Sequence, residues 1–493
     1  MAITNGNNLN SVPAPSQQTL STNYLDLNGS GGWAQQYLPD LIAQEAEVFG
    51  PRTISGFLAQ VGAEEAMSAD QVIWSEQGRL HLSYKGDIDA ENVITIQSDI
   101  DGNFGASATI VEAGMTTHGI RLNDTVIVSN ANVTVKCLVT AISGADVTVA
   151  PYDGVAIAAL TTNLATTILV YGSEYAKGTG YNAAAATTVE SRGANEPDFK
   201  TFSNKPVILK DYYEVSGSDA SRVGWVETAS EEGSAGYLWY LKAEADTRAR
   251  FNDHLEMSML EGVKGSNTNA VDTFLGGVIA GNDELVGTQG LFDAIEDRGN
   301  VTSGVTGVNA ATDLAEFDSI LAEFDKQGAI EENMMFVNRA TSLAMDDMLA
   351  SMNSYGAGGT SYGVFENDED MALNLGFSGF RRGSYDFYKS DFRYLNDLAT
   401  RGGINAANAA AAIRGVIIPA GTSTVYDQQM GKNLKRPFLH VRYRASQTDD
   451  RRMKTWVTGS VGAATSALDA MQIHMLSERC LVTQGANNFM LMK

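Results

Sequence analysis

The stretch from residue 237 to 261 constrains the fold most, because it contains neither glycine nor proline. As one helix it spans roughly 37 Å at about 1.5 Å per residue, which is more than most domain cores require. Glu244 with Arg248 and Asp246 with Arg250 form acid-first pairs four residues apart on its exposed side. The residues expected to pack inward are Leu238, Leu241, Ala245, Ala249, Leu255 and Met259. The pattern predicts a long amphipathic helix within a larger fold.

The composition predicts a folded protein of a reducing compartment. The chain has 493 residues, 44% of them hydrophobic, which is enough for about three domains with real cores. It contains no apolar run of the roughly 18 residues needed to cross a bilayer, and residues 1 to 30 lack the pattern of a secretion signal. Cys137 and Cys480 are its only cysteines, too few for a disulfide framework or a zinc cluster. We expect a cytoplasmic protein that binds no membrane.

The charge is strongly acidic, with one basic exception. A net charge of −25 opposes general binding to nucleic-acid phosphates. The segment 432–454, however, carries eight Lys and Arg against two Asp. Alternation in a strand places Arg442 and Arg444 on one face and Val441 and Tyr443 on the other. Two interpretations stay open for the arginines: a solvated strand face, or a contact surface for the acidic face of a neighbouring copy. The subunit-contact candidates are Arg442, Arg444, Arg451 and Arg452.

The first 230 residues predict an arm, a hairpin and an inserted module. Residues 1–50 form an arm with a short helix near its end, and Val72, Trp74, Leu80, Leu82 and Tyr84 alternate around "EQG" as in a β-hairpin. Between residues 87 and 195 Lys and Arg nearly vanish and short β-type runs follow one another, with "SGAD" as a turn. This composition predicts a small β-barrel or sandwich inserted into the larger fold. Residues 204–216 look like the returning strand of the element that it interrupts.

The second half of the chain alternates between helical and strand patterns. "DLAEFDSILAEFDKQG" predicts a helix with Asp313 as N-cap, Glu316 in the capping box and Gly328 at the end. "NMMFVN" predicts a buried strand and "RATSLAMDDMLASM" another helix, as in a layered α/β domain. From "RRGSYDFYKS" onward the patterns predict mainly strands, with one more helix in residues 466–476.

Catalytic and metal-binding patterns are almost absent from this sequence. The five histidines lie far apart, without metal-ligand spacing, and there is neither a phosphate-binding loop nor a nucleophile elbow. Asp99, Asp101 and Asn103 alternate as in calcium loops, but Phe104 stands where such a loop requires glycine, so a plain turn is the competing interpretation. Cys480 fits a buried structural cysteine. We expect no enzyme and no cofactor.

Taken in order, these pieces resemble the major capsid proteins of tailed bacteriophages, which have the Hong Kong 97-like fold, and most closely those of crAss-like phages. The family has an arm, an E-loop hairpin, a long "spine" helix, an axial domain and returning strands. The same order is found here. The arm is followed by "QVIWSEQGRLHLSYKG" with "NKPVILKDYYEVS", then by the helix 237–261, "GLFDAIEDRGN" and the strands around "HVRYR". The inserted module departs from the pattern.

The resemblance implies an α+β fold divided along these lines. The expected parts are the N-terminal arm and short helix (1–50), the E-loop region (51–86 and 196–230), the inserted β-rich module (87–195), the spine helix of the P-domain (231–262), an A-domain (263–430) and returning P-domain and A-domain strands (431–493). A rigid helix on a flat domain suits a subunit that tiles a closed shell.

The resemblance also implies a function and partners. The expected function is a non-enzymatic major capsid protein that self-assembles into hexamers and pentamers of an icosahedral head, enclosing double-stranded DNA without sequence-specific binding. It would be assembled in the bacterial cytoplasm and end in the virion, with portal, scaffold and decoration proteins as partners. Two alternatives stay open: a shell protein of a cellular nanocompartment with the same fold, or a carbohydrate-binding, adhesive virion protein. The adhesive alternative requires exposed aromatic side chains.

Overall fold

A computed structural model describes most of the chain outside its first 57 residues. The described residues are 58, 63–77, 81, 83–88, 92–99, 118–130, 133–154, 157, 166–178, 199–220, 238–265, 270–275, 287–327, 330–352, 379–420, 422–427, 432–460 and 464–493. The predicted N-terminal arm, with its short helix, therefore lies outside the described residues.

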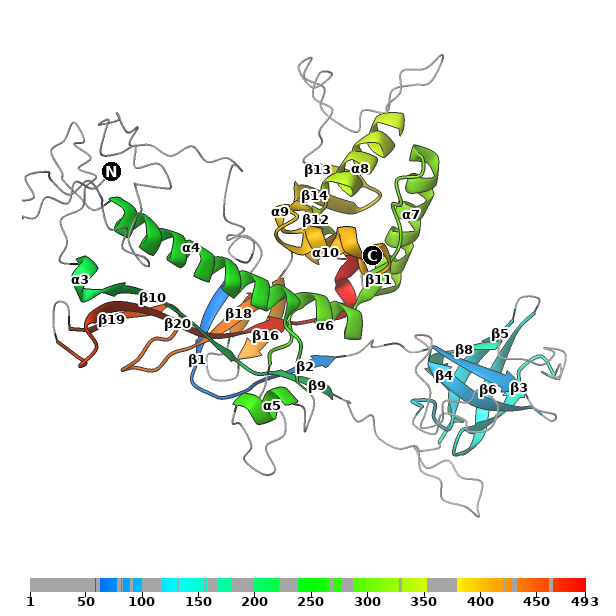
Figure 1. Cartoon of the computed structure of the whole chain (residues 1–493). Coiled ribbons are helices and arrows are strands. Elements are labelled where there is room, and N and C mark those ends of the chain that lie inside the picture. Colours follow the sequence, from blue (N-terminus) through cyan, green and yellow to red (C-terminus); the bar gives the residue numbers. More distant parts are fainter. Residues whose placement is uncertain are drawn as a thin grey trace, which may run out of the picture. The chain divides into compact units, whose positions relative to one another are not determined.

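The chain divides into two compact units (Figure 1). Unit 1 comprises Met1–Trp74 and Phe202–Lys493, and unit 2 comprises Ser75–Thr201. Strands β2 (Val72–Gln77) and β9 (Phe199–Asn204) run across the two sequence boundaries and pair with each other. The predicted hairpin around "EQG" is therefore wrong, because β2 takes a partner from far along the chain and β3 (Ser83–Ile88) belongs to unit 2.

The first sheet of unit 1 lies under the long helix α4 (Leu238–Glu261), as Figure 1 shows. Its strands are β1 (Ala63–Met67), β10 (Val207–Ser216), β18 (Leu439–Arg444), β19 (Lys454–Gly459) and β20 (Ala470–Thr483). Strand β20 is central, with β10 along one side and β19 and β18 along the other, while β1 adds to β18 in parallel. The N- and C-terminal parts of the chain thus meet in one sheet.

Helix α4 is close to the predicted rod, but the predicted inward stripe needs correction. Its described buried residues recur every fourth position and are Thr247, Phe251, Leu255 and Met259, joined by Glu256 and Leu260. Phe251 and Leu255 pack on Met475 of β20. Ala245 is exposed. The buried residues repeat every four positions from Thr247 through Phe251, and Ala245 does not fall on this repeat. The side chains of Leu238 and Leu241 lie outside the described residues.

The predicted helix at residues 466–476 is also wrong. Residues from Ala470 onward form β20, the longest strand of the described chain. Ala, Leu and Met favour helices in isolation, but β20 has strand partners on both sides, and these tertiary contacts outweigh local propensity.

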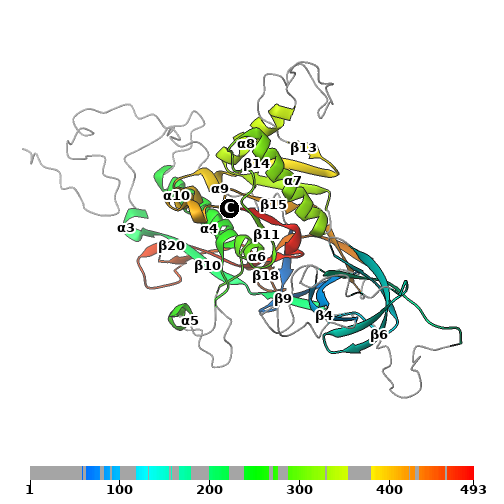
Figure 2. The ribbon, with the colours of Figure 1, turned by 90° about the vertical axis from the view of Figure 1, so that its right-hand side faces the viewer.

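The second sheet of unit 1 is mixed and has six strands. In spatial order they are β11 (Asn300–Thr302), β21 (Met490–Met492), β15 (Gly415–Pro419), β12 (Glu332–Val337), β14 (Tyr385–Asp391) and β13 (Gly379–Arg382). Helices α7 (Ala310–Gln327) and α8 (Arg339–Met352) pack on it (Figure 2), burying Phe317, Met345 and Phe387 together. The strand and helix predicted at residues 333–352 are confirmed.

The N-terminus of α7 differs from the prediction by four residues. Asn309 precedes the helix, and its side-chain Oδ1 accepts a hydrogen bond from the backbone N–H of Thr312 at 2.9 Å. Asp313 lies inside the first turn and accepts instead from the backbone of Gly307 at 2.8 Å. The cap is therefore Asn309, and Asp313 fixes the preceding loop.

Short elements complete unit 1. They are α3 (Gly217–Ala220), α5 (Ala270–Leu275), α6 (Leu291–Arg298), α9 (Arg393–Asn396), α10 (Arg401–Ala407), the 3-10 turns η4 (Ala409–Ala411) and η5 (Ala486–Asn488), and the paired strands β16 (Thr422–Asp427) and β17 (Lys432–Pro437). At the base of β2 and β9, the Arg298 guanidinium of α6 lies over the rings of Trp74 and Phe202, 5.6 and 4.4 Å from their centroids. This contact anchors the strand pair to unit 1.

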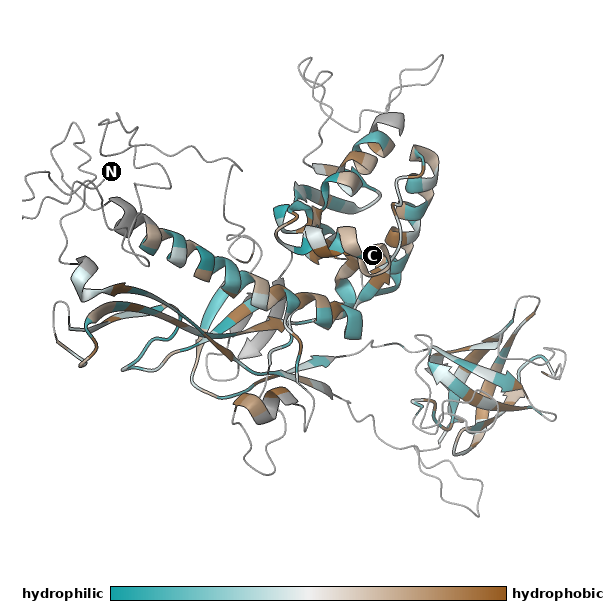
Figure 3. Cartoon of the chain, viewed as in Figure 1, coloured by the Kyte–Doolittle hydropathy of each residue, from teal (hydrophilic) through white to brown (hydrophobic). Residues whose placement is uncertain are grey.

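Unit 2 is a small closed β-barrel. Its strands, in order round the barrel, are β3 (Ser83–Ile88), β4 (Val93–Asp99), β7 (Asp146–Pro151), β6 (Thr134–Ser143), β5 (Asp124–Ser129) and β8 (Thr166–Ser173). Hydrophobic and hydrophilic residues alternate along them (Figure 3), and Val135, Cys137 and Val139 of β6 point into the core. The turn after β6 has Gly144 at φ +63°, as "SGAD" predicted. The barrel begins earlier than the predicted residue 87, because β3 is one of its strands.

Candidate subunit-contact site

The predicted basic segment includes β18, which lies beside strand β1 at an edge of the first sheet. The two strands pair in parallel, with Glu65 opposite Arg442 and Met67 opposite Arg444. The Arg442 Nη2 atom lies 2.7 Å from Glu65 Oε2. Each strand therefore supplies one sign of charge to the other.

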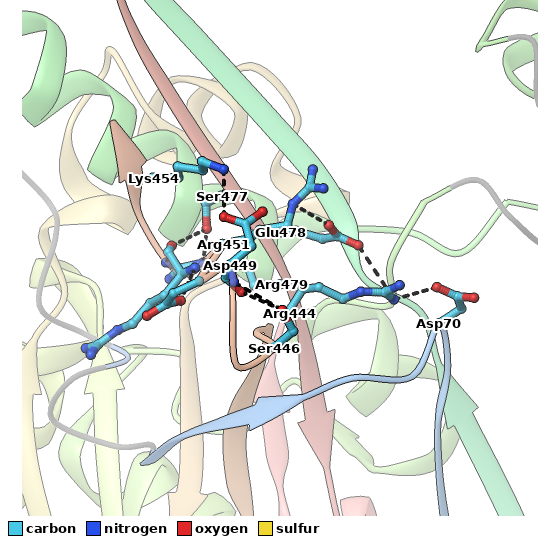
Figure 4. Close-up of polar contacts among 11 residues, drawn as sticks. Asp70, Arg444, Ser446, Asp449, Arg451, Lys454, Ser477, Glu478 and Arg479 are labelled. Carbon is cyan, nitrogen blue, oxygen red and sulfur yellow. Dashed lines mark hydrogen bonds and ion pairs between the residues drawn. The ribbon is translucent and has the colours of Figure 1, made fainter. Parts of the chain in front are cut away.

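Arg444 continues this pairing on the same face of the sheet (Figure 4). Its Nη1 donates to Asp70 Oδ1, just beyond β1, and lies 4.0 Å from Glu478 Oε1 of β20. The Arg451 Nε atom reaches the other oxygen of Glu478 at 2.8 Å. The hydrogen bond to Asp70 raises the pKa of the Arg444 guanidinium, so this side chain stays a cation. Asp70 and Arg444 are 374 residues apart in the chain.

A turn after β18 brings two further arginines to the sheet. The backbone N–H of Ser446 donates to Asp449 O at 2.8 Å, and the Lys454 ammonium bonds Asp449 Oδ1 at 2.6 Å. The returning chain is fixed to β20 through the carbonyl of Arg452, which accepts from Ser477 Oγ at 2.6 Å and from Arg479 Nη2 at 2.9 Å. These bonds hold the backbone of Arg451 and Arg452 in place.

On the face toward α4, Glu64 of β1 is shared by two guanidinium groups. Its carboxylate oxygens lie 2.5 Å from Arg452 Nη2 and 3.7 Å from Arg479 Nη1. Burial lowers the pKa of Arg479, and the charges of Glu64 and of Glu256 on α4 oppose that change. A buried cation is tolerated in a sheet only with such partners.

The site is nearly neutral, although the chain is not. Five guanidinium groups meet five carboxylates, which gives no net charge, against −25 for the whole chain. The guanidinium groups are those of Arg442, Arg444, Arg451, Arg452 and Arg479, and the carboxylates those of Glu64, Glu65, Asp70, Glu256 and Glu478. The four arginines of the segment thus do not form a net positive surface, because carboxylates of the same chain offset their charges.

The structure brings all four predicted arginines to one site and adds partners that the sequence did not reveal. Arg452 is the most open of the four, with 56% of its side chain exposed, whereas Arg442 is 17% exposed. The acidic partners in "AEEAM" were missed because a parallel pairing over such a sequence distance leaves no local pattern. Contact with a neighbouring subunit stays a prediction for these arginines.

The other candidate residues are not brought to this site. Leu255 packs between α4 and the sheet, and Met259 lies in the main core of unit 1. Asp99 ends β4 in unit 2, while Asp101 and Asn103 lie outside the described residues. Within the described ranges no group of three His, Cys, Asp or Glu side chains could hold a metal ion. Cys137 and Cys480 are both buried, as expected for structural cysteines.

No helix in the described part of the chain is long and apolar enough to span a bilayer. No family model matches the chain, and no curated protein matches it. Among solved structures, the capsid structure of the cyanophage P-SCSP1u is similar over 97% of this chain and 98% of its own, with 8% identity and a TM-score of 0.40. A chain of Gordonia phage Cozz is similar over 97% and 98%, with 11% identity and a TM-score of 0.37.

A chain from the capsid of a native GTA particle is similar over 95% of this chain and 98% of its own, with 9% identity and a TM-score of 0.37.

Proposed function

We propose that this chain is the major capsid protein of a tailed bacteriophage and forms the icosahedral shell around its double-stranded DNA. It assembles through hexamers and pentamers of itself, in the cytoplasm of a bacterial host, and remains in the virion. Portal, scaffold and decoration proteins are its further partners, and it belongs with the capsid proteins of crAss-like phages. The chain encloses DNA without reading its sequence.

One observation carries the proposal: the order in which the chain builds unit 1. The first described strand, β1, and the late strands β18, β19 and β20 form one sheet under α4, while the last strand, β21, joins the second sheet. An early strand, a long helix, a second layered domain and returning strands are the order of the resembled capsid family. Under this proposal the first sheet with α4 is the P-domain and the second sheet with α7 and α8 is the A-domain.

The physical properties of unit 1 suit a shell tile. Helix α4 has 24 residues and is held along the sheet by a continuous buried row from Thr247 to Met259. Such a helix resists bending, and a repeated closed shell requires rigid subunits. The net charge of −25 supports enclosure instead of binding, since an acidic wall repels packaged DNA.

The barrel occupies the place of an insertion in the E-loop under this proposal. It is entered along β2 and left along β9, whose pairing is the base of that loop. For the barrel, a carbohydrate-binding role is a second candidate, because Tyr152 and Tyr171 are 51% and 50% exposed there. A glycan array probed with assembled particles tests it, with Tyr152→Ala and Tyr171→Ala as the variants expected to lose binding.

Electron microscopy of the purified chain tests the main proposal. We expect hexameric and pentameric rings and closed shells, with faster sedimentation than a single chain of 52.6 kDa. A chain that stays monomeric at all accessible concentrations, with scaffold protein supplied, contradicts the proposal. Shells that form around protein cargo and never package DNA favour the nanocompartment alternative.

A further inference from the structure

An aromatic row crosses three strands on the face of the first sheet that points away from α4. Tyr212 of β10, His474 of β20 and Trp456 of β19 stand opposite one another in the strand register. The His474 ring is stacked between the other two, 6.1 Å from Tyr212 at 28° and 5.1 Å from Trp456 at 18°. The three strands lie side by side in Figure 1.

The row is fixed in place before any partner binds. The Thr458 hydroxyl is hydrogen-bonded to His474 Nε2 at 2.7 Å and to Gln472 Oε1 at 3.3 Å. Gln472 Nε2 in turn donates to Glu214 Oε2 at 2.7 Å. Side chains held this way lose little rotamer freedom on binding, which favours affinity.

The same row is open to solvent. Tyr212 is 57% exposed and Trp456 36%, and Ile208, on the same face of β10, is 50% exposed. On β10 and β20 the opposite face is covered by α4, through Leu209 and Met475. Rigid, exposed aromatic side chains are the kind of group that dominates protein contacts.

The charges around the row decide which partner fits. Among the described residues around the row, two cations, Lys210 and Lys454, are matched in number by two anions, Glu214 and Asp449, and the Lys454 ammonium bonds Asp449 Oδ1 at 2.6 Å. This surface continues into the neutral arginine–carboxylate site through Glu478, on the same face of β20. Two copies of a chain with a net charge of −25 repel each other. The repulsion is weakest where a neutral, apolar surface of one copy faces a neutral, apolar surface of the other.

We infer that the face formed by Ile208, Tyr212, His474 and Trp456 is a docking surface for a second copy of this chain. The inference rests on the proposed function and specifies one subunit contact of the shell. Burying the two aromatic side chains supplies apolar area, and the neutral surround avoids the repulsion that the rest of the surface imposes.

The experiment has two arms, each with a matched control. In the first, Tyr212→Ser combined with Trp456→Ser is compared with Tyr388→Ser, which removes a tyrosine 52% exposed on β14 of the second sheet. We expect the double variant to raise the concentration at which particles form by about tenfold or more, with the control unchanged. An unchanged thermal midpoint shows that the double variant is still folded.

In the second arm, a photo-cross-linking phenylalanine analogue replaces Tyr212 in one sample and Tyr388 in the other. We expect mass spectrometry to find inter-copy cross-links to peptides of this same chain from position 212 and not from position 388. The inference is overturned if the double variant assembles like the unaltered chain and if particles that carry the analogue at position 212 form without such cross-links. These results leave the proposed function standing. A chain that forms neither capsomers nor particles contradicts both.

Discussion

The carboxylate of Glu261, the last residue of α4, accepts a hydrogen bond from Arg401 Nη1 of α10 at 2.8 Å. Its other oxygen accepts from the Tyr394 hydroxyl of α9 at 2.9 Å. Burial, reinforced by the charge of Glu261 and by this bond, raises the pKa of Tyr394, so the phenol stays a donor at any physiological pH. The end of the long helix is thereby fixed to the segment that leads into β15.

Replacing Glu261 with Ala should therefore destabilise unit 1. The change removes the charged acceptor that the guanidinium and the phenol share, and only 16% of the Arg401 side chain is exposed. We expect a loss of about 1–3 kcal/mol in the free energy of unfolding. Glu323→Ala is the control, because its pair with Lys326 is largely exposed and should contribute about 0–1 kcal/mol. Equal losses in urea titrations of the two variants would show that the Glu261 contacts are not special.

Truncating Phe251 tests the corrected packing face of α4. Phe251 is 1% exposed against Leu255 and Met475, so Phe251→Ala should lower stability by about 3–5 kcal/mol. Leu255→Asp should be at least as damaging, since it buries an unpaired carboxylate. Ala245→Ser, on the exposed side, should change the unfolding free energy by less than about 0.5 kcal/mol. A soluble, normally assembling Leu255→Asp variant would mean that another face packs inward.

Several elements follow from local pattern, and these were predicted well. Helix α8 matches "RATSLAMDDMLASM" to the residue, because an apolar stripe between strand and loop identifies a helix without outside help. The barrel was predicted from the scarcity of Lys and Arg and from the alternation of its short strands, whose apolar side chains form the barrel core.

The failures share one cause: partners that lie far away in sequence. Strand β2 pairs with β9 instead of with its neighbour, and β20 is a strand because β10, β18 and β19 surround it. The candidate site shows the same limit. Four of its arginines stand in one basic segment, but Glu64, Glu65 and Asp70 reach them from the other end of the chain. No spacing rule connects such residues.

The alkaline stability of the chain should depend on Cys480. Burial raises the pKa of this thiol to about 12 from 9.0, the charge of Arg442 opposing the change. An acid with a raised folded pKa contributes its full stability below the unfolded pKa and loses it as the pH rises through the folded one. At about pH 10.5 the loss from this group is about 2 kcal/mol relative to neutral pH.

Cys480→Ala isolates that contribution. Both chains lose stability at high pH through lysines and tyrosines, so only the difference between them is informative. We expect the unaltered chain to lose about 2 kcal/mol more than the variant between about pH 8 and pH 10.5, measured by denaturant unfolding. Parallel pH profiles for the two chains would contradict the raised thiol pKa.

The barrel should fold when it is expressed without the rest of the chain. Residues 75–201 form a compact unit with a closed sheet and a separate core that includes Ile94, Val126 and Ile168. We expect a strand-type circular dichroism spectrum and cooperative thermal unfolding. Val126→Asp, which places a carboxylate in that core, should abolish both. A helical or unfolded spectrum of the unaltered fragment would show that the barrel depends on unit 1.

Assembly should pass through a maximum as salt rises, and the four arginines should differ in their part in it. Copies at −25 repel each other at low salt, and screening within about 8–10 Å at physiological ionic strength relieves that repulsion. High salt then weakens specific ion pairs. Arg452 is the most exposed of the four and so the best placed for a neighbour, whereas Arg442 is largely occupied with Glu65.

Charge reversal distinguishes these roles. Arg452→Glu should lower the particle yield, followed by light scattering across a salt series, more than it lowers the thermal midpoint. Arg442→Glu should act chiefly on stability, because it sets two carboxylates of β1 and β18 side by side and detaches the edge strand. Repeating the series with calcium at matched ionic strength tests Asp99, Asp101 and Asn103: an effect beyond screening supports a calcium loop, and none supports a plain turn. A yield that is flat with salt and unaltered by either reversal would show that these arginines only stabilise the sheet of their own chain.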